Sequence, residues 1–295
     1  MSDRTPSSSH SVTVTLVAFE TNEIQLQRAI RSVLESTIGA AVVVVDNSPT
    51  DRLRNAVIAG GAEYRWAGEN LGFGAAHNRA IQECGGVSRY HLILNPDVYF
   101  GPEVLESLVS YMDANPQIGL VMPRILYPDG SPQNLRKLLP TPADLLLRRL
   151  LVGPLSELLH RRTQKYELRD VDPMRSMTVP VLSGCFMFLR TEVFEKVGLF
   201  DERYFMYLED VDFCRRIHGA FDVVYYPQVS IVHEYAKGSY RDWKLLWYHV
   251  KSACAYFSKW GWFVDKERDS INAKALRHAE ARQSDFSDQL AAETE

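Results

Sequence analysis

Apolar runs alternate with amphipathic stretches over the first hundred residues of the chain. A β-branched run covers residues 12–19 (VTVTLVAF), and a second run at 41–45 (AVVVV) is apolar at every position. A strand that is apolar on both faces is typical of a parallel sheet covered by helices on both sides. Between the runs, residues 21–36 carry apolar side chains at helical spacing, and either Thr21 or Asn22 can cap that helix.

The same alternation continues into a fourth predicted strand. We expect a short helix near 50–59, a strand at 63–66 (EYRW), a helix over 74–84 and a strand at 91–94 (HLIL). The order β-α-β-α-β-α-β predicts an α/β fold with a doubly wound, mainly parallel sheet flanked by helices. In such a sheet, ligands bind in the crevice outside the carboxyl ends of the strands.

Polar or aromatic residues follow the end of each of these strands. The four ends carry Phe19 with Glu20, Asp46, Glu69 with Asn70, and Asn95 with Asp97. Asn and Asp open turns in many proteins, but four such ends in a row favour a nucleotide-sized site. Magnesium is typically bound by one or two carboxylates plus substrate phosphates and water, so Asp97 is a candidate metal ligand. The alternative is that Asp97 caps the helix that begins near Gly101.

A glycine-rich segment, ENLGFGAAHNRA at 69–80, opens the third predicted helix. Its glycines, Gly72 and Gly74, depart from the dinucleotide-binding fingerprint because His77 occupies the third glycine position. A loop of this kind can present backbone N–H groups to phosphate. A tight turn without a ligand explains the segment equally well.

The second half of the chain is less regular. We expect a strand over 179–190 that is broken at Ser183 and Gly184, then a helix, and later strands at 222–227 and 229–232. The sharpest acidic cluster comprises Glu209, Asp210 and Asp212, at the start of a predicted helix. The helix dipole alone favours acids there. However, the aromatic segment RYFMY before them would lower the local dielectric, and a carboxylate in such a place can act as a general base.

Composition narrows the class of protein. The 295 residues are 46% hydrophobic and 24% charged, with a formal charge of −4, so nucleic acid is not expected as a partner. The four cysteines have no paired spacing, which argues against disulfides or a zinc site and suits a reducing cytoplasm. The polar start of the chain does not read as a signal peptide, and no apolar run reaches the roughly 18 residues of a membrane-spanning helix.

Seven motifs occur in the order typical of family 2 glycosyltransferases: VAFE, VVVVDNSPTD, NLGFGAAHN, LILNPDV, VLSGCFMFLR, GLFDERYFMYLEDVDFCRRI and VSIVHEYAKGS. Over residues 12–260 the chain resembles this family, and especially its bacterial rhamnosyltransferases and galactofuranosyltransferases. The resemblance implies a GT-A fold and inverting transfer from a nucleotide-diphosphate sugar, with dTDP-L-rhamnose as the best guess. It also implies a divalent metal cofactor, Mg²⁺ or Mn²⁺.

The resemblance also assigns roles to residues. It implies nucleotide-sugar binding by Phe19, Glu20, Asp46, Asn70, Gly72, Asn78, Asn95 and Asp97; a general base at Asp210; metal or diphosphate ligands at Asp97 and His233; and a sugar and acceptor pocket at Ser183, Gly184 and Glu209. Two departures weaken the match. Phe19 and Glu20 stand where the family usually has Tyr-Asn, and Asn95 offers only a neutral carbonyl where the family usually has an Asp.

The resemblance implies a single catalytic domain over residues 12–265, with a nucleotide-binding half at 12–100 and an acceptor-binding half at 101–265. Residues 1–11 are expected to be a disordered tail, and residues 266–295 a charged helix or tail.

Two segments bear on partners. Residues 143–162 combine leucines with arginines, and residues 243–263 combine Trp, Tyr and Phe with lysines, which describes helices lying in a membrane interface. The same pattern fits helices that pack internally or between copies of a homo-oligomer. The family often uses polyprenyl-diphosphate-linked or other glycan acceptors, so we expect a cytoplasmic protein that contacts the inner face of the cell membrane.

Two alternatives stay open at this point. One is a transferase of another sugar, such as galactofuranose from a UDP donor. The other is a non-catalytic GT-A module that binds a glycan or a partner enzyme, although the intact set of Asp97, Asp210 and His233 argues against it.

Overall fold

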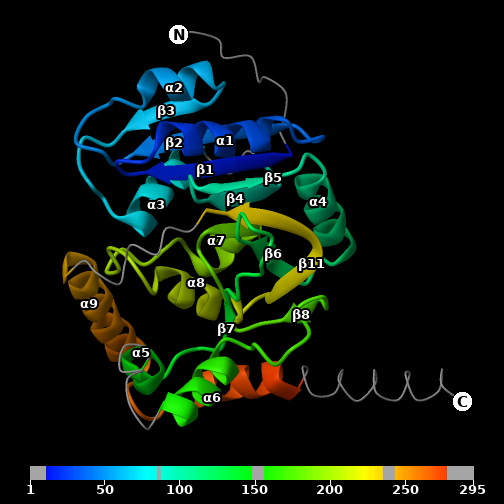
Figure 1. The fold of residues 1–295 in the computed structure, drawn as a ribbon, viewed down its shortest axis with the longest axis vertical. Coiled ribbons are helices and arrows are strands. Elements are labelled where there is room, and N and C mark those ends of the chain that lie inside the picture. Colours follow the sequence, from blue (N-terminus) through cyan, green and yellow to red (C-terminus); the bar gives the residue numbers. More distant parts are fainter. Residues whose placement is uncertain (1–10, 85–87, 148–155, 235–242, 278–295) are drawn as a thin grey trace, which may run out of the picture.

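The computed structural model describes residues 11–84, 88–147, 156–234 and 243–277 (Figure 1). Its strands are β1 (Val12–Ala18), β2 (Ala40–Asp46), β3 (Glu63–Trp66), β4 (Tyr90–Leu94), β5 (Val98–Phe100), β6 (Ile118–Leu126), β7 (Arg136–Lys137), β8 (Met177–Thr178), β9 (Val181–Leu182), β10 (Phe186–Arg190) and β11 (Asp222–His233). Its helices are α1 (Glu23–Leu34), α2 (Arg54–Ala59), α3 (Phe73–Cys84), α4 (Val104–Ala114), α5 (Pro142–Leu147), α6 (Ser156–Tyr166), α7 (Glu192–Val197), α8 (Glu209–Ile217) and α9 (Trp243–Trp260).

Within these described residues, one sheet of nine strands organises the molecule. Its order is β3-β2-β1-β4-β10-β6-β11-β5, and β8 pairs with β11. Strands β3, β2, β1 and β4 are parallel, as are β6 and β11, whereas β10 and β5 run antiparallel to their neighbours. The predicted α/β fold with a mainly parallel central sheet is therefore confirmed.

The predicted two-sided burial of β2 is confirmed. Val42 and Val44 belong to the main core cluster, together with Leu26 and Ile30 of α1. Residues 43 and 45 point to the other face and pack with α3 through Ala76 and Ala80. In the part of the sheet formed by β1 and β2, helices therefore cover both faces. In a sheet of this kind, ligands bind at the carboxyl ends of the strands. Asn22 is the cap of α1, since its side chain accepts the N–H groups of Ile24 and Gln25.

The antiparallel strand β10 determines what lies beside β4. Phe186, at the start of β10, pairs with Leu94 at the end of β4. Because the two strands run in opposite directions, the loop before β10 must lie at the carboxyl end of β4. The predicted interruption at Ser183 and Gly184 forms this loop, between β9 and β10.

The structure corrects the prediction of two strands at 222–227 and 229–232. They form one strand, β11, with an irregularity in its pairing to β6 between Tyr226 and Ser230. Pro227 lies inside this irregularity, where a residue without an N–H group does not interrupt the ladder.

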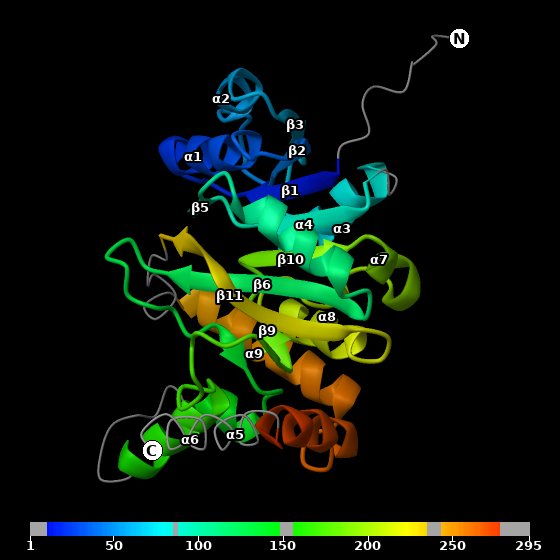
Figure 2. The same ribbon diagram turned by 90° about the vertical axis from the view of Figure 1, so that its right-hand side faces the viewer.

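Helices α5 and α6 lie at the end of the molecule opposite β1–β3 (Figures 1 and 2). The predicted leucine-rich segment 143–162 falls on α5 and α6, and its residues 148–155 lie outside the described ones. Leu145 packs against the core, so at least this leucine faces the protein. In the parts of the chain that the structure describes, no helix is long and apolar enough to cross a membrane.

Residues 266–277 are helical and pack onto the domain. Ala275 is buried in the main core cluster, and the Asn272 side chain exchanges two hydrogen bonds with the Leu139 backbone. This part of the predicted C-terminal helix or tail therefore belongs to the folded body; residues 278–295 lie outside the described ones.

Candidate active site

Two aromatic rings are exposed at the carboxyl ends of β1 and β3. Phe19 and Trp66 expose 45% and 43% of their surfaces. Between them, at the end of β2, Asp46 is fully buried, and its carboxylate accepts the Tyr64 hydroxyl at 2.8 Å and the Ser48 N–H at 3.0 Å. Of the residues predicted to bind the nucleotide here, Phe19 is accessible and Asp46 lies beneath the surface.

Trp66 is a site residue that the sequence interpretation left without a role. Its indole N–H donates to the Ser48 carbonyl at 3.0 Å, so the ring is held in place while the residue stays partly exposed to solvent. The Glu20 N–H also donates to Ser48, at 2.8 Å, and ties the loop after β1 to the same turn. The available signal was an aromatic residue at the end of the strand EYRW.

The glycine-rich loop docks against the segment that precedes α8. Gly72 has φ +85°, and a Cβ at this position would collide with the Phe205 carbonyl oxygen. The next N–H, that of Phe73, donates to the same oxygen at 3.0 Å. Asn70 closes the loop by accepting the Gly72 N–H at 3.0 Å. Glycine is therefore required at residue 72 for close backbone approach.

Asn78 fastens α3 to a segment far away in the sequence. Its amide accepts the Phe200 N–H and donates to the Phe200 carbonyl, both at 2.9 Å, and also donates to Glu202. The residue is 3% exposed. Asn78 thus holds the chain that leads into the acidic cluster, and its buried amide is bonded to protein groups, so its predicted part in nucleotide-sugar binding stays a prediction.

The structure brings Asp97 and His233 together. Asp97 follows β4, His233 ends β11, and His233 Nε2 lies 3.4 Å from Asp97 Oδ1. That oxygen is buried and has no hydrogen-bond partner among the described residues. An orphaned carboxylate oxygen beside an imidazole nitrogen is a donor set that fits a divalent cation.

No group of three or more His, Cys, Asp or Glu side chains in the described residues is arranged to hold a metal. A magnesium site does not need one, because substrate phosphates and water complete the coordination around one or two protein ligands. The residues present therefore fit a cation that binds together with a diphosphate.

Asp97 and Asp210 both lie near one short loop. The Asn95 N–H donates to the Cys185 carbonyl at 2.9 Å, and the Gly184 N–H donates to Asp210 Oδ2 at 3.1 Å. Burial raises the pKa of the Cys185 thiol to about 12, and the charges of both Asp97 and Asp210 add to this rise. The loop that includes predicted pocket residues Ser183 and Gly184 is thus close to both acids, which are 113 positions apart in the sequence.

The backbone before Asp210 is strained. Tyr207 and Leu208 have φ of +71° and +67°, a region that costs residues with side chains of order 1–3 kcal/mol and occurs at functional sites. Helix α8 begins directly after them. Asp210 stays partly exposed, with its Oδ1 accepting the Val211 N–H at 2.8 Å.

Glu209 differs from its neighbour. It is 6% exposed, and burial together with the Asp210 charge raises the pKa of its carboxyl group well above the ordinary value. The predicted pocket residue Glu209 thus lies below the surface, where burial disfavours the charged form of its carboxyl group, whereas Asp210 stays partly exposed.

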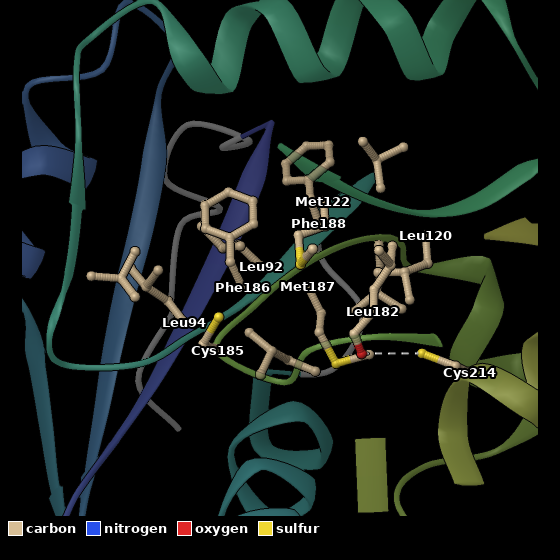
Figure 3. Packing of buried hydrophobic residues seen from close by; sticks show 14 of the residues in the cluster. Leu92, Leu94, Leu120, Met122, Leu182, Cys185, Phe186, Met187, Phe188 and Cys214 are labelled. Atoms are coloured by element: carbon tan, nitrogen blue, oxygen red, sulfur yellow. Dashed lines mark hydrogen bonds between the residues drawn. The ribbon is translucent and has the colours of Figure 1, made fainter. Parts of the chain in front are cut away.

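The rest of α8 is tied into the protein. Cys214 Sγ lies 3.6 Å from the Leu182 carbonyl, which connects the helix to β9 just before the Ser183–Gly184 loop (Figure 3). Asp212, the third acid of the cluster, is fully buried and accepts hydrogen bonds from Trp260 at 2.7 Å and Arg216 at 2.9 Å. Asp212 is therefore a structural anchor, whereas Asp210 faces the site.

Comparisons with known proteins agree with this geometry. Residues 14–198 match the family model described as Glycosyl transferase family 2. The chain is 32% identical over 216 residues to the N-acetylglucosaminyl-diphospho-decaprenol L-rhamnosyltransferase of Mycobacterium tuberculosis, covering 68% of this chain and 69% of the relative. It is 31% identical over 179 residues to the low-salt glycan biosynthesis hexosyltransferase Agl10 of Haloferax volcanii, covering 60% and 53%.

Solved structures share the fold. The mannosyltransferase PcManGT from Pyrobaculum calidifontis, in complex with GDP-Man and Mn²⁺, matches with a TM-score of 0.54 at 17% identity, over 97% of this chain and 81% of that one. GalNAc-T7 with UDP, GalNAc and Mn²⁺ matches with a TM-score of 0.57 at 16% identity, over 78% of this chain and 44% of that one. The chain therefore belongs to glycosyl transferase family 2 and is a glycosyltransferase with a GT-A fold.

Proposed function

We propose that this glycosyltransferase moves one sugar, with inversion, from a nucleotide-diphosphate donor to a lipid-linked glycan acceptor. L-Rhamnose from dTDP-rhamnose is the proposed donor, in the synthesis of a bacterial cell-envelope polysaccharide. The observation that carries the proposal is that Asp97 and Asp210 both lie close to the Ser183–Gly184 loop, near enough for the charge of each to act on the Cys185 thiol. The relative from M. tuberculosis supports the choice of sugar and of a polyprenyl-diphosphate acceptor.

Asp210 is the proposed general base. Its carboxylate is partly exposed and fixed by the N–H groups of Gly184 and Val211. It would accept the proton of the acceptor hydroxyl as this oxygen forms its bond to the anomeric carbon, while the bond to the donor diphosphate breaks. Attack from the face opposite the leaving group inverts the anomeric centre in one displacement, so a single base suffices.

Asp97 and His233 are the proposed residues at the diphosphate. When bound, Mg²⁺ or Mn²⁺ would neutralise the negative charge that develops on the leaving diphosphate. Both side chains lie at strand ends of one sheet, which holds them in place before the donor arrives.

The donor base is proposed to bind between the ends of β1 and β3. Phe19 and Trp66 offer exposed aromatic faces there, and stacking on such faces is favourable for any base. The pair therefore supports nucleotide binding without deciding between thymine and uracil.

The acceptor side is proposed to meet the inner face of the membrane. Along α9, Trp243, Trp247 and Val250 form an exposed apolar stripe at helical spacing, with 82%, 64% and 44% of their surfaces exposed. The opposite face of α9 packs on the segment before Asp210: Ser252 donates to the Met206 carbonyl at 2.8 Å. An interfacial helix in this place would bring a lipid-linked acceptor close to the base. Docking of a second copy on the stripe is the competing explanation.

A donor panel tests the function. Purified protein with Mn²⁺ is assayed for hydrolysis and transfer with dTDP-rhamnose, UDP-galactofuranose and other nucleotide sugars, alongside Asp210→Asn and Asp97→Ala. Asp129→Asn, in an exposed turn, is the matched control. Turnover of dTDP-rhamnose that both site substitutions reduce by about a hundredfold or more supports the proposal.

Other outcomes of the donor panel would contradict the proposed sugar, the proposed activity or the assigned residues. Turnover of UDP-galactofuranose alone would replace rhamnose with that sugar. Binding of a nucleotide sugar without turnover of any donor or acceptor would favour a binding module. Turnover that survives both substitutions would refute the assignment of Asp97 and Asp210.

A further inference from the structure

The Gln133 side chain forms two hydrogen bonds with His233, one to its backbone and one to its ring. Gln133 lies in the connection between β6 and β7 and is 8% exposed. Its Nε2 donates to the His233 carbonyl at 2.7 Å and to the Leu126 carbonyl at 3.3 Å. Its Oε1 lies 3.0 Å from His233 Nδ1. A residue one hundred positions away thus holds both the backbone and the ring of the histidine.

These contacts determine which way the Gln133 amide points. Two carbonyl oxygens, which can only accept, face the amide nitrogen. Turning the amide over would place its oxygen against both of them and lose both hydrogen bonds. The oxygen therefore faces the His233 ring, and because this oxygen can only accept, Nδ1 must carry the proton.

The tautomer decides what the other ring nitrogen presents. In a neutral imidazole with the proton on Nδ1, Nε2 carries a lone pair. In this structure Nε2 faces the buried Asp97 Oδ1, which has no hydrogen-bond partner among the described residues. Two acceptors facing each other at 3.4 Å favour a cation that both can contact. Two ligands of one octahedral cation, each at about 2.1 Å, lie about 3 Å apart.

We propose that Gln133 is a positioning residue that fixes the Nδ1–H tautomer of His233, so that Nε2 is directed at a divalent cation shared with Asp97. Asp97 is held beside His233 by a separate backbone contact, since the Glu234 N–H donates to the Asp97 carbonyl at 2.9 Å. The inference rests on the metal role proposed above for Asp97 and His233. The tautomer can be measured without metal, donor or acceptor. A wrong prediction of the tautomer can therefore be told apart from a wrong prediction of the function.

The experiment combines two readouts on the full chain. Long-range ¹H–¹⁵N spectra of the metal-free protein at about pH 8, where an ordinary histidine is neutral, report the tautomer of His233, assigned with His233→Gln. Binding of free Mn²⁺, followed by electron paramagnetic resonance, reports affinity. The variants are Gln133→Met, which keeps the length and removes the amide, and Gln133→Glu, which gives up the two N–H donations to the Leu126 and His233 carbonyls but keeps the acceptor for Nδ1–H, so that the two variants separate the acceptor from the donors. Asn272→Leu, which removes an amide that is bonded to the Leu139 backbone and lies away from His233 in the sequence, is the control.

We expect the Nδ1–H tautomer in the wild type, in Gln133→Glu and in Asn272→Leu, and a mixture or the Nε2–H form in Gln133→Met. Mn²⁺ affinity should fall about tenfold or more in Gln133→Met, as is usual when the partner of a ligating histidine is lost, and stay within about threefold in the other two. An Nε2–H tautomer in the wild type overturns the proposal, even if Gln133→Met does not fold. Equal loss of Mn²⁺ affinity in Gln133→Met and Gln133→Glu, or no loss in Gln133→Met, would reduce Gln133 to a packing role.

Discussion

Substitution of Gly72 by alanine should separate the glycine-rich loop from the 205–208 segment, which leads to the proposed general base, Asp210. Gly72 has φ +85°, and the added Cβ would lie 3.0 Å from Phe205 Cδ2 and closer still to the Phe205 carbonyl oxygen. Because that oxygen is a backbone atom held by the Phe73 N–H, it cannot move away without losing the hydrogen bond. The loop and the 205–208 segment would have to separate.

The expected cost has two parts. A residue with a Cβ in the left-handed region costs roughly 1–2 kcal/mol. Loss of the hydrogen bond between Phe73 and Phe205 adds about 1 kcal/mol, and the displaced contacts add to this. We expect Gly72→Ala to lower the free energy of unfolding by about 3 kcal/mol, and to weaken donor binding because the loop no longer holds its shape.

Gly68→Ala is the matched control. Gly68 has φ +78° but nothing within 4 Å of an added Cβ, so this variant carries the backbone cost alone. Urea denaturation of both variants gives the difference, which should be about 1 kcal/mol or more, and donor titration should show a loss only for Gly72→Ala. Equal losses at the two positions would refute the role assigned to the contact between Gly72 and Phe205.

Three further predictions concern separate parts of the molecule. Trp66→Ala should weaken nucleoside diphosphate binding about tenfold, measured by calorimetry, because the exposed ring at the end of β3 is lost as a stacking surface. Replacing Trp243 and Trp247 together by Ser should reduce sedimentation with anionic vesicles about tenfold or more, without changing hydrolysis of a free donor. Burial lowers the pKa of His77 and of His91 to about 3. Since each folded-state pKa lies below the unfolded value of about 6.5, protonation of each histidine in the unfolded chain lowers the free energy of unfolding as the pH falls below that value. The difference in free energy of unfolding between wild type and His91→Gln should therefore shift against the wild type by about 2 kcal/mol between pH 7 and pH 5.

Ile58→Ser, an exposed apolar residue on α2, is the control for the tryptophan variants. Nucleotide affinity that is the same in Trp66→Ala and Ile58→Ser would remove Trp66 from the site. Unchanged vesicle binding together with a change from dimer to monomer would assign the α9 stripe to contact between copies. A pH-independent difference between wild type and His91→Gln would show that the histidine takes up a proton in the folded protein.

Much of the fold followed from the sequence because the N-terminal strands are apolar on both faces and separated by amphipathic helices. The order of the later strands could not be predicted in this way. The position of β10 depends on pairing of Phe186 with Leu94, and no local signal specifies a partner so distant in the chain. Pro227 led to the wrong prediction of two separate strands, because proline usually ends a strand. In the structure, the irregular pairing of β11 with β6 accommodates this proline inside one continuous strand.

The candidate site shows the same division. Asp97, Asp210 and His233 were predicted because each belongs to a motif, and the structure places Asp97 beside His233 and puts both acids at one loop. Gln133 was not predicted, because its importance comes from contact with a residue one hundred positions away. The burial of Glu209 was also beyond the sequence, since its neighbour Asp210, of the same chemical type, stays partly exposed.

Anomalous diffraction at the manganese edge, from crystals grown with Mn²⁺ and a nucleoside diphosphate, tests most directly whether Asp97, His233 and Asp210 share one donor site. We expect a manganese peak contacting Asp97 and His233, with the diphosphate beside it and the Asp210 carboxylate facing the same cavity. A manganese peak elsewhere on the protein, or a nucleotide bound away from the carboxyl ends of β1 to β4, would contradict this expectation.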